Sequence, residues 1–136
     1  MCALSILLIF GAVSDFATNC GGPQIRASNQ IVYESDNEAL GPANYLVHSS
    51  DKWAASNVGL PAGSNNVTYT YNSQRQFVSL DSELFQTVRM SAGSLRYYGL
   101  GLQNGNYSVL LRFAEIQIES STQRTWRSLG RRVFDI

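Results

Sequence analysis

Residues 101–116 read GLQNGNYSVLLRFAEI, and this stretch decides the fold. Asn104-Gly105 lies between apolar residues and favours the positive φ angles that a two-residue β-hairpin turn requires. The odd-numbered positions of residues 107–113 are all apolar, and they alternate with a mixed set, as the period of a strand dictates. The stretch therefore predicts a hairpin and a strand near the middle of an antiparallel sheet that packs against a second layer.

Further short apolar segments, separated by Gly, Pro, Ser and Asn, recur along the chain, and none of them keeps the period of a helix. Strands are predicted at residues 31–33, 67–71, 85–90, 95–102, 107–118 and 132–136. Such segments in a chain of 136 residues predict one all-β domain, an antiparallel β-sandwich. About seven strands close a sandwich of this kind. Because the sequence reaches residue 136 inside a predicted strand, we expect the sandwich to be incomplete at its C-terminus.

The N-terminus carries an uncharged apolar block, ALSILLIFGAV, at residues 3–13. A bilayer core of about 30 Å needs a longer helix, whereas a signal peptide has a core of this length. An uncleaved anchor and the irregular start of a truncated chain are the alternatives. Asn66 and Asn106 each begin an N-glycosylation triplet, which is used only in the secretory pathway. We therefore expect a signal peptide within residues 1–18, an extracellular protein, and glycans at one or both asparagines.

The balance of charge argues against a nucleic-acid partner. Ten basic residues offset ten acidic ones, so no overall field attracts nucleic acid or anionic lipid. The basic residues that cluster in the sequence are Arg124, Arg127, Arg131 and Arg132. A solvated loop face is the simplest interpretation of that cluster.

The sequence offers little for catalysis or for metal binding. His48 is the only histidine, so a site with several histidines is excluded, and a position in a surface loop is the simpler interpretation. Asp36 and Glu38 have the chemistry for proton transfer or calcium, but their surroundings are typical of a solvated turn. The glycines at residues 99–105 lack the spacing and the following helix of a phosphate loop. We expect no enzyme, no metal and no cofactor.

Cys20 has no obvious partner. Cys2 would leave with a signal peptide, and Cys20 would then be alone in a compartment where thiols usually pair. Two interpretations stay open: a disulfide with a partner outside this chain, or a buried free thiol that behaves as a small apolar side chain.

Aromatic residues make up 11% of the chain and raise the question of a sugar site. An aromatic ring covers the apolar face of a pyranose while polar neighbours bind its hydroxyls, but core packing is the alternative role for every ring. Tyr97 and Tyr98 are adjacent on a predicted strand, so their rings point to opposite faces. One of the two must face away from the core.

Five motifs occur in order along the chain: Asn19-Cys20-Gly21-Gly22-Pro23, Trp53-Ala54-Ala55-Ser56, residues 95–102 (LRYYGLGL), residues 105–116 and residues 130–136 (GRRVFDI). Together they resemble the malectin domain of plant leucine-rich-repeat receptor-like kinases, over residues 19–136. The resemblance implies a jelly-roll sandwich of the carbohydrate-binding-module type. It also implies display outside the cell, at the plasma membrane in a full-length relative.

The resemblance implies a truncated domain as well. Domains of this family continue beyond the Phe134-Asp135-Ile136 strand, and their late cysteines would be natural partners for Cys20. In the animal lectin that names the family, an aromatic pair after the Phe-Ala-Glu motif contacts glucose units. Gln117 and Ile118 occupy those positions here.

Two functions follow as hypotheses. The first is a module that binds a glycan or cell-wall carbohydrate, with Phe85, Tyr97, Tyr98 and Gln117 as candidate ligand-binding residues. The second is a structural segment of a receptor ectodomain that contacts a receptor or co-receptor protein and has no sugar site. An exposed aromatic shelf beside polar groups would favour the first, and burial of Phe85, Tyr97 and Tyr98 would favour the second. Kinase activity would belong only to a full-length relative, because the chain has no catalytic-loop motif.

Overall fold

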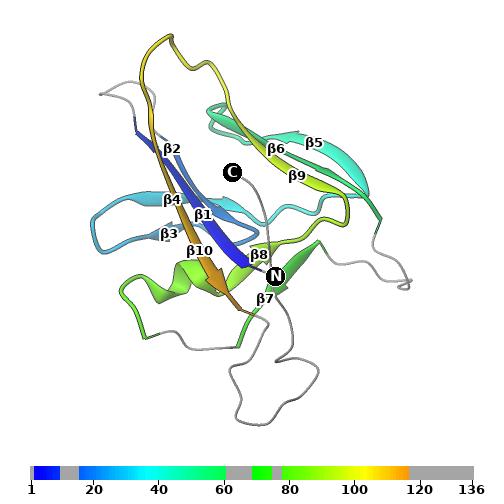
Figure 1. Ribbon diagram of the computed structural model, residues 1–136, viewed down its shortest axis with the longest axis horizontal. Helices are drawn as coiled ribbons and strands as arrows, with labels where there is room; N and C mark the ends of the chain where they lie inside the picture. The colour runs from blue at the N-terminus through cyan, green and yellow to red at the C-terminus, as the bar shows by residue number, and fades with distance from the viewer. Residues whose placement is uncertain (1, 10–15, 61–68, 75–77, 117–136) are drawn as a thin grey trace.

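The computed structural model describes residues 2–9, 16–60, 69–74 and 78–116, which are drawn in colour in Figure 1. These residues form ten strands and one short 3-10 helix, so the predicted all-β class is confirmed. The elements are β1 (Cys2–Ile9), β2 (Phe16–Cys20), β3 (Ile25–Arg26), β4 (Val32–Asp36), β5 (Ala43–Val47), β6 (Trp53–Val58), β7 (Thr70–Asn72), η1 (Ser82–Phe85), β8 (Thr87–Arg89), β9 (Ser94–Gly99) and β10 (Ser108–Glu115).

The strands build three sheets. The largest has the order β10-β1-β2-β4-β3, the second β5-β6-β9, and the third is the β7-β8 pair. All pairings are antiparallel except that of β2 with β4. The parallel pair arises because β3 lies between β2 and β4 in the sequence but at the edge of the sheet.

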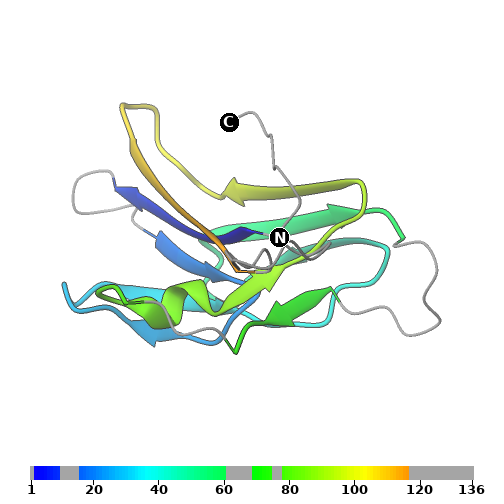
Figure 2. The ribbon, with the colours of Figure 1, turned by 60° about the horizontal axis from the view of Figure 1, so that its bottom comes forward.

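The five-stranded sheet, whose strands are blue and orange in Figure 2, has packing on both of its faces and is called the middle sheet. Phe16 and Cys20 of β2 pack on Trp53 and Ala55 of the three-stranded sheet. Ala17, on the opposite face of β2, packs with a group that includes Leu84 of η1. The period of two along β2 thus gives the middle sheet an apolar contact on both faces.

Two adjacent glycines let β8 approach the end of β2. Gly21 has a φ of 79°, and a Cβ there would lie 2.4 Å from the backbone nitrogen of Arg89. A Cβ on Gly22 would lie 2.1 Å from Oγ1 of Thr87. The Gly-Gly pair of the first sequence motif is therefore required by close packing of β8 against this corner.

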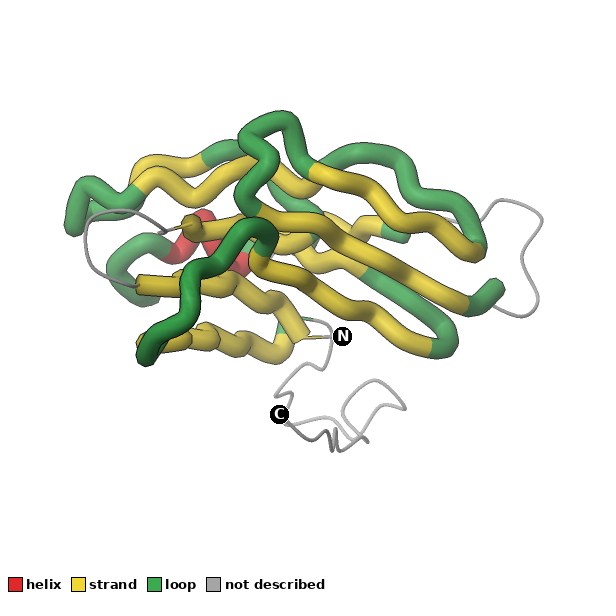
Figure 3. Tube along the Cα trace, turned by 90° about the horizontal axis from the view of Figure 1, so that it is seen from above, coloured by secondary structure: helices red, strands yellow, loops and turns green. Residues whose placement is uncertain are grey.

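The predicted hairpin at Asn104-Gly105 is wrong. Strand β9 pairs with β6, whereas β10 pairs with β1, so the loop over residues 100–107 crosses from one sheet to another (Figure 3). Neither Asn104 nor Gly105 has a positive φ, which a type I′ turn would require. The hairpin signal is local, and packing between layers overrides it here.

The predicted place of the following strand is also wrong, although the strand itself exists. Strand β10 lies at an edge of the five-stranded sheet rather than near its middle. Leu111 packs against the core, but Val109 and Phe113 on the same apolar face are 56% and 39% exposed. The apolar face of β10 therefore extends past the area that the second layer covers.

Other predicted strands match in part. The segments at 31–33, 85–90 and 95–102 overlap β4, β8 and β9, although η1 occupies the start of the second of these. The segment at 67–71 overlaps β7, and residues 67–68 lie outside the described residues. The prediction for 132–136 lies outside the described residues as well, as do the clustered arginines. The strands that were not predicted are β1, β2, β3, β5 and β6.

The apolar N-terminal block overlaps β1, which lies between β10 and β2 (Figure 1). Its backbone pairs with β10 from Cys2↔Glu115 to Ile9↔Ser108, and with β2 from Ser5↔Asn19 to Leu8↔Phe16. A cleaved signal peptide would remove this strand from the sheet. The leader stays a prediction, and its consequence for the sheet is testable.

Candidate functional site

A buried polar cluster joins all three sheets at Asp36, the last residue of β4. The Asp36 carboxylate accepts hydrogen bonds from Nε of Arg89 at 2.7 Å, from Nη2 of Arg89 at 2.6 Å and from the Tyr97 hydroxyl at 2.5 Å. The backbone N–H of Gly21 donates to the same carboxylate at 3.0 Å. Arg89 also donates to the backbone oxygens of Asp36 and Glu38. Each oxygen of a buried carboxylate thus has donors, and strands β4, β8 and β9 meet at one residue.

The solvated turn predicted around Asp36 is therefore wrong. Asp36 is only 2% exposed and Arg89 is 3% exposed, whereas Glu38 is exposed. A buried carboxylate needs a buried partner, and the fold provides one 53 residues away in the sequence. No turn signal in the sequence contains that information.

Burial dominates the protonation equilibria of this cluster. Burial raises the pKa of Tyr97 well above 10.0, and the nearby Cys20 and Asp36 raise it further. Burial also raises the pKa of the Cys20 thiol, and this outweighs the hydrogen bond with Tyr97 that lowers it. Burial alone would lower the pKa of Arg89, but hydrogen bonds and charge from Asp36 raise it overall. The cluster therefore holds a neutral phenol and a neutral thiol beside one compensated ion pair.

Cys20 is a free cysteine with 1% exposure. A protonated, buried thiol is a poor nucleophile for disulfide exchange, because the thiolate is the reacting form. This geometry supports the free-thiol interpretation. The disulfide with a partner outside this chain stays a prediction, and it would require access to the interior beside Tyr97.

A second cluster lies where the β5–β6 turn meets β4. Oε2 of Glu34 accepts hydrogen bonds from Nε1 of Trp53 at 2.6 Å and from Oγ of Ser50 at 2.8 Å, and it lies 3.0 Å from Nδ1 of His48. The rings of His48 and Trp53 stack with centroids 4.7 Å apart and planes 12° apart. Asp51, with a φ of 55°, completes the turn.

This second cluster does not form a catalytic triad. A triad uses both ring nitrogens of its histidine, one toward the nucleophile and one toward the carboxylate. Here Ser50 and Glu34 both lie at Nδ1 of His48. His48 does lie in a loop, as predicted, but its side chain is only 15% exposed, because it covers Trp53. The cluster joins two layers of the sandwich.

An exposed aromatic pair lies on the outer face of the three-stranded sheet. Tyr45 of β5 is 58% exposed and Tyr98 of β9 is 37% exposed. Their ring centroids are 5.8 Å apart, with an angle of 60° between the planes. Both rings stand beside β6, where Ala54 is completely covered although its side chain points outward. The two tyrosines form an aromatic shelf over a strand with small side chains.

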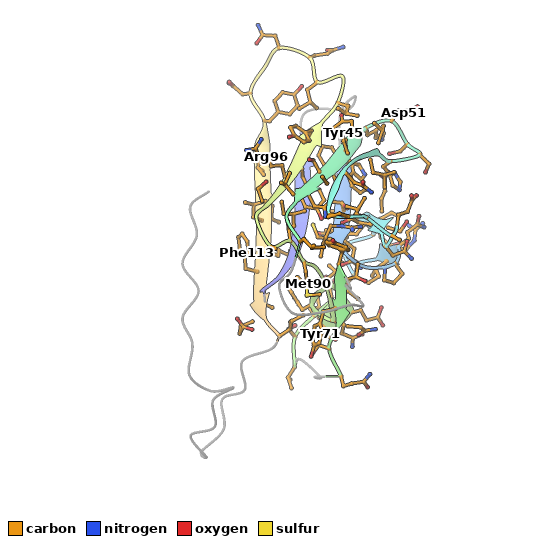
Figure 4. The ribbon with its side chains drawn as sticks, turned by 90° about the vertical axis from the view of Figure 1, so that its right-hand side faces the viewer. Tyr45, Asp51, Tyr71, Met90, Arg96 and Phe113 are labelled. Carbon is orange, nitrogen blue, oxygen red and sulfur yellow. The ribbon has the colours of Figure 1, made fainter. Side chains whose placement is uncertain are left out.

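The side chains on the outer face form rows across β5, β6 and β9, because the pairing of these strands is uninterrupted. Tyr45 is opposite Ser56, which is opposite Arg96. Ala54 is opposite Tyr98 in the neighbouring row. Figure 4 labels Tyr45 on β5 and Arg96 on β9, both in the upper part of the view. The shelf therefore combines two rings, a hydroxyl on the floor and a guanidinium at the margin.

The residues predicted to bind a ligand are not brought together. Tyr97 points inward to Asp36, and Tyr98 points outward, which confirms that one ring of the pair faces away from the core. Phe85 ends η1 on the other side of the middle sheet and packs against Val88 and Ile116. Gln117 lies outside the described residues.

Of the two predicted glycosylation sites, the structure describes one. Asn106 is exposed in the loop before β10. Asn66 lies outside the described residues. Attachment of a glycan at either position stays a prediction.

Sequence reasoning missed Tyr45 and Arg96 as site residues. Arg96 carried a signal, because its spacing of two from Tyr98 places both side chains on one face of a strand. Tyr45 carried none, because β5 was not predicted and its nearness to Tyr98 depends on the register of β5 on β6.

The described residues contain no group of three or more metal-ligating side chains. In the same part of the chain, no helix has the length and apolar character to cross a membrane.

Comparison with known proteins identifies the family. The model of the malectin domain matches residues 14–136. A probable LRR receptor-like serine/threonine-protein kinase of Arabidopsis thaliana is 61% identical over 127 residues, which cover 93% of this chain and 12% of that protein. A second such kinase from the same plant is 58% identical over 127 residues, with the same coverage. A third is 38% identical over 124 residues, which cover 87% of this chain and 12% of that protein.

The chain thus spans about an eighth of the length of these relatives, since 12% of each is covered. No solved structure matches it. The five ordered motifs, the all-β layers and a family match over residues 14–136 lead to one conclusion: this chain belongs to the malectin domain family.

Proposed function

We propose that this chain is a glycan-binding module in the extracellular part of a receptor-like kinase. Its family and its kinase relatives in Arabidopsis thaliana support the place in a receptor. The observation that carries the binding function is the aromatic shelf of Tyr45 and Tyr98 on the outer face of the three-stranded sheet. Water solvates the apolar faces of such exposed rings poorly, and the rings stack well on the apolar face of a sugar.

The shelf differs from the site that the family resemblance implies. That site centres on the positions of Gln117 and Ile118, which stand in this sequence where the animal lectin has an aromatic pair. The proposed surface lies on strands β5, β6 and β9 and uses none of those positions. It binds with its side chains and performs no chemistry on the sugar.

Calorimetry and a glycan array on the 136-residue chain test this function. We expect Tyr45→Ala and Tyr98→Ala each to weaken binding of a responding oligosaccharide about fivefold or more, since one ring contact contributes about 1 kcal/mol. Tyr45→Phe keeps the ring and should retain most of the affinity. Phe113→Ala is the matched control, because Phe113 is 39% exposed but lies on β10.

Two results would count against the proposal. One is the absence of binding to any glycan, and the other is an equal loss of affinity in Phe113→Ala. In that case the exposed apolar edge of β10 favours the second function, contact with a receptor or co-receptor protein.

A further inference from the structure

Arg96 is the only charged residue in β5, β6 and β9. It is exposed, and among the described residues none forms an ion pair with it. By contrast, Arg89 and Arg112 both lie beside carboxylates. Within the three strands of this sheet, Arg96 is therefore a single cation with no counter-ion among the described residues.

The position of this cation relative to the rings follows from the register. Arg96 lies two strands from Tyr45, across Ser56, and two residues from Tyr98 along β9. These steps correspond to about 10 Å and about 7 Å between the Cα positions. One or two sugar rings resting on the tyrosines would span such a distance, with a substituent at the guanidinium.

We infer that this surface selects acidic sugars, with the carboxylate of a uronic acid on Arg96 and its pyranose ring on Tyr45 or Tyr98. The inference rests on the proposed function of the shelf. A guanidinium binds a carboxylate through two parallel hydrogen bonds, and it does so in one plane. A uronic acid has the carboxylate and the apolar ring face in one residue, so both contacts are available to the same ligand.

The same surface is poorly suited to an acidic peptide. Recognition of acidic motifs in peptides generally uses clusters of arginines, and this sheet has one. The floor between the edge strands is made by Ala54 and Ser56, whose small side chains leave room for a flat ring. The ring pair and the single cation together favour a sugar acid.

The experiment compares a trimer of glucuronic acid with its methyl ester, which has the same rings and no charge, on the full 136-residue chain. We expect the acid to bind about threefold to tenfold more tightly than the ester, which is the range for an exposed but bidentate ion pair. Arg96→Gln should abolish this preference, so that the acid and the ester bind about equally. Arg26→Gln is the matched control, since Arg26 is exposed on β3. High salt should reduce the preference, because exposed charges are screened.

The outcomes separate the two proposals. Equal binding of acid and ester that depends on Tyr45 would overturn the selection of acidic sugars and leave the glycan-binding function intact. Binding of neither compound, together with no response on the array, would count against both. If a hexapeptide of glutamate bound as tightly as the sugar acid and Tyr45→Ala did not weaken it, the surface would be a simple cation patch and the inference would fail.

Discussion

At the scale of single residues, Asp36 is the side chain on which the arrangement of the three sheets depends most directly. It neutralises the buried Arg89 and accepts the hydroxyl of Tyr97. Removing one charged side chain of a buried ion pair destabilises a protein much more than replacing both with apolar side chains. The charge that remains then has neither solvent nor a counter-ion. Asp36 is therefore a structural residue, although the sequence around it is typical of a solvated turn.

We expect Asp36→Asn to lower the free energy of unfolding by about 3–5 kcal/mol, the usual cost of an unpaired buried charge. The double variant Asp36→Asn, Arg89→Met removes both charges and should recover a large part of the loss. Asp51→Asn, in an exposed turn, is the control and should stay within about 0.5 kcal/mol of the parent. Urea unfolding followed by circular dichroism provides the values. A loss below about 1 kcal/mol in Asp36→Asn would show that Arg89 is not held in a dry interior.

At the scale of elements, β1 has two incompatible roles. The composition of the N-terminal block predicts a signal peptide, whereas the backbone of Cys2–Ile9 pairs with both β2 and β10. A chain that begins at Ser14 lacks this strand. The facing edges of β2 and β10 would then be unpaired, and unpaired edges promote association with other chains.

We expect a product that starts at Ser14 to have a lower urea midpoint than the full chain and to scatter more light at the same concentration. The N-terminal sequence of the protein secreted from a plant host shows which form is made. If the two forms had the same urea midpoint and both stayed monomeric, β1 would be dispensable to the sheet. Cleavage of a signal peptide would then not reduce the stability of the protein.

At the scale of the whole molecule, the layers are joined by polar groups that must stay protonated. The pKa values of Tyr97, Cys20 and Tyr33 are all raised in the folded protein, first of all by burial. A raised pKa means that the folded state holds its proton more tightly than the unfolded state. Stability from these groups is complete below their ordinary pKa values of 9.0 for the thiol and 10.0 for the phenols, and it is lost above them.

We therefore expect the free energy of unfolding to fall progressively as pH rises above about 9, the ordinary value of the thiol. Tyr97→Phe should make the fall less steep, because it removes one ionisable group from the cluster. Tyr45→Phe, at an exposed position, should leave the slope unchanged. Urea midpoints between pH 7 and pH 10.5 test this expectation. A stability that is constant over this range would mean that the phenol and the thiol are accessible to solvent.

The sequence by itself determined the class of the fold, the family, the existence of β4, β8, β9 and β10, and the opposite orientations of Tyr97 and Tyr98. These features depend on the period of side chains along a strand and on short motifs, which neighbouring residues encode. Only the tertiary structure decided that β9 and β10 enter different sheets, that Asp36 is buried against Arg89, and that Tyr45 meets Tyr98 beside Arg96. Each of these depends on which distant strand becomes a neighbour. That choice minimises exposed apolar area and unpaired polar groups over the whole chain, so no local pattern contains it.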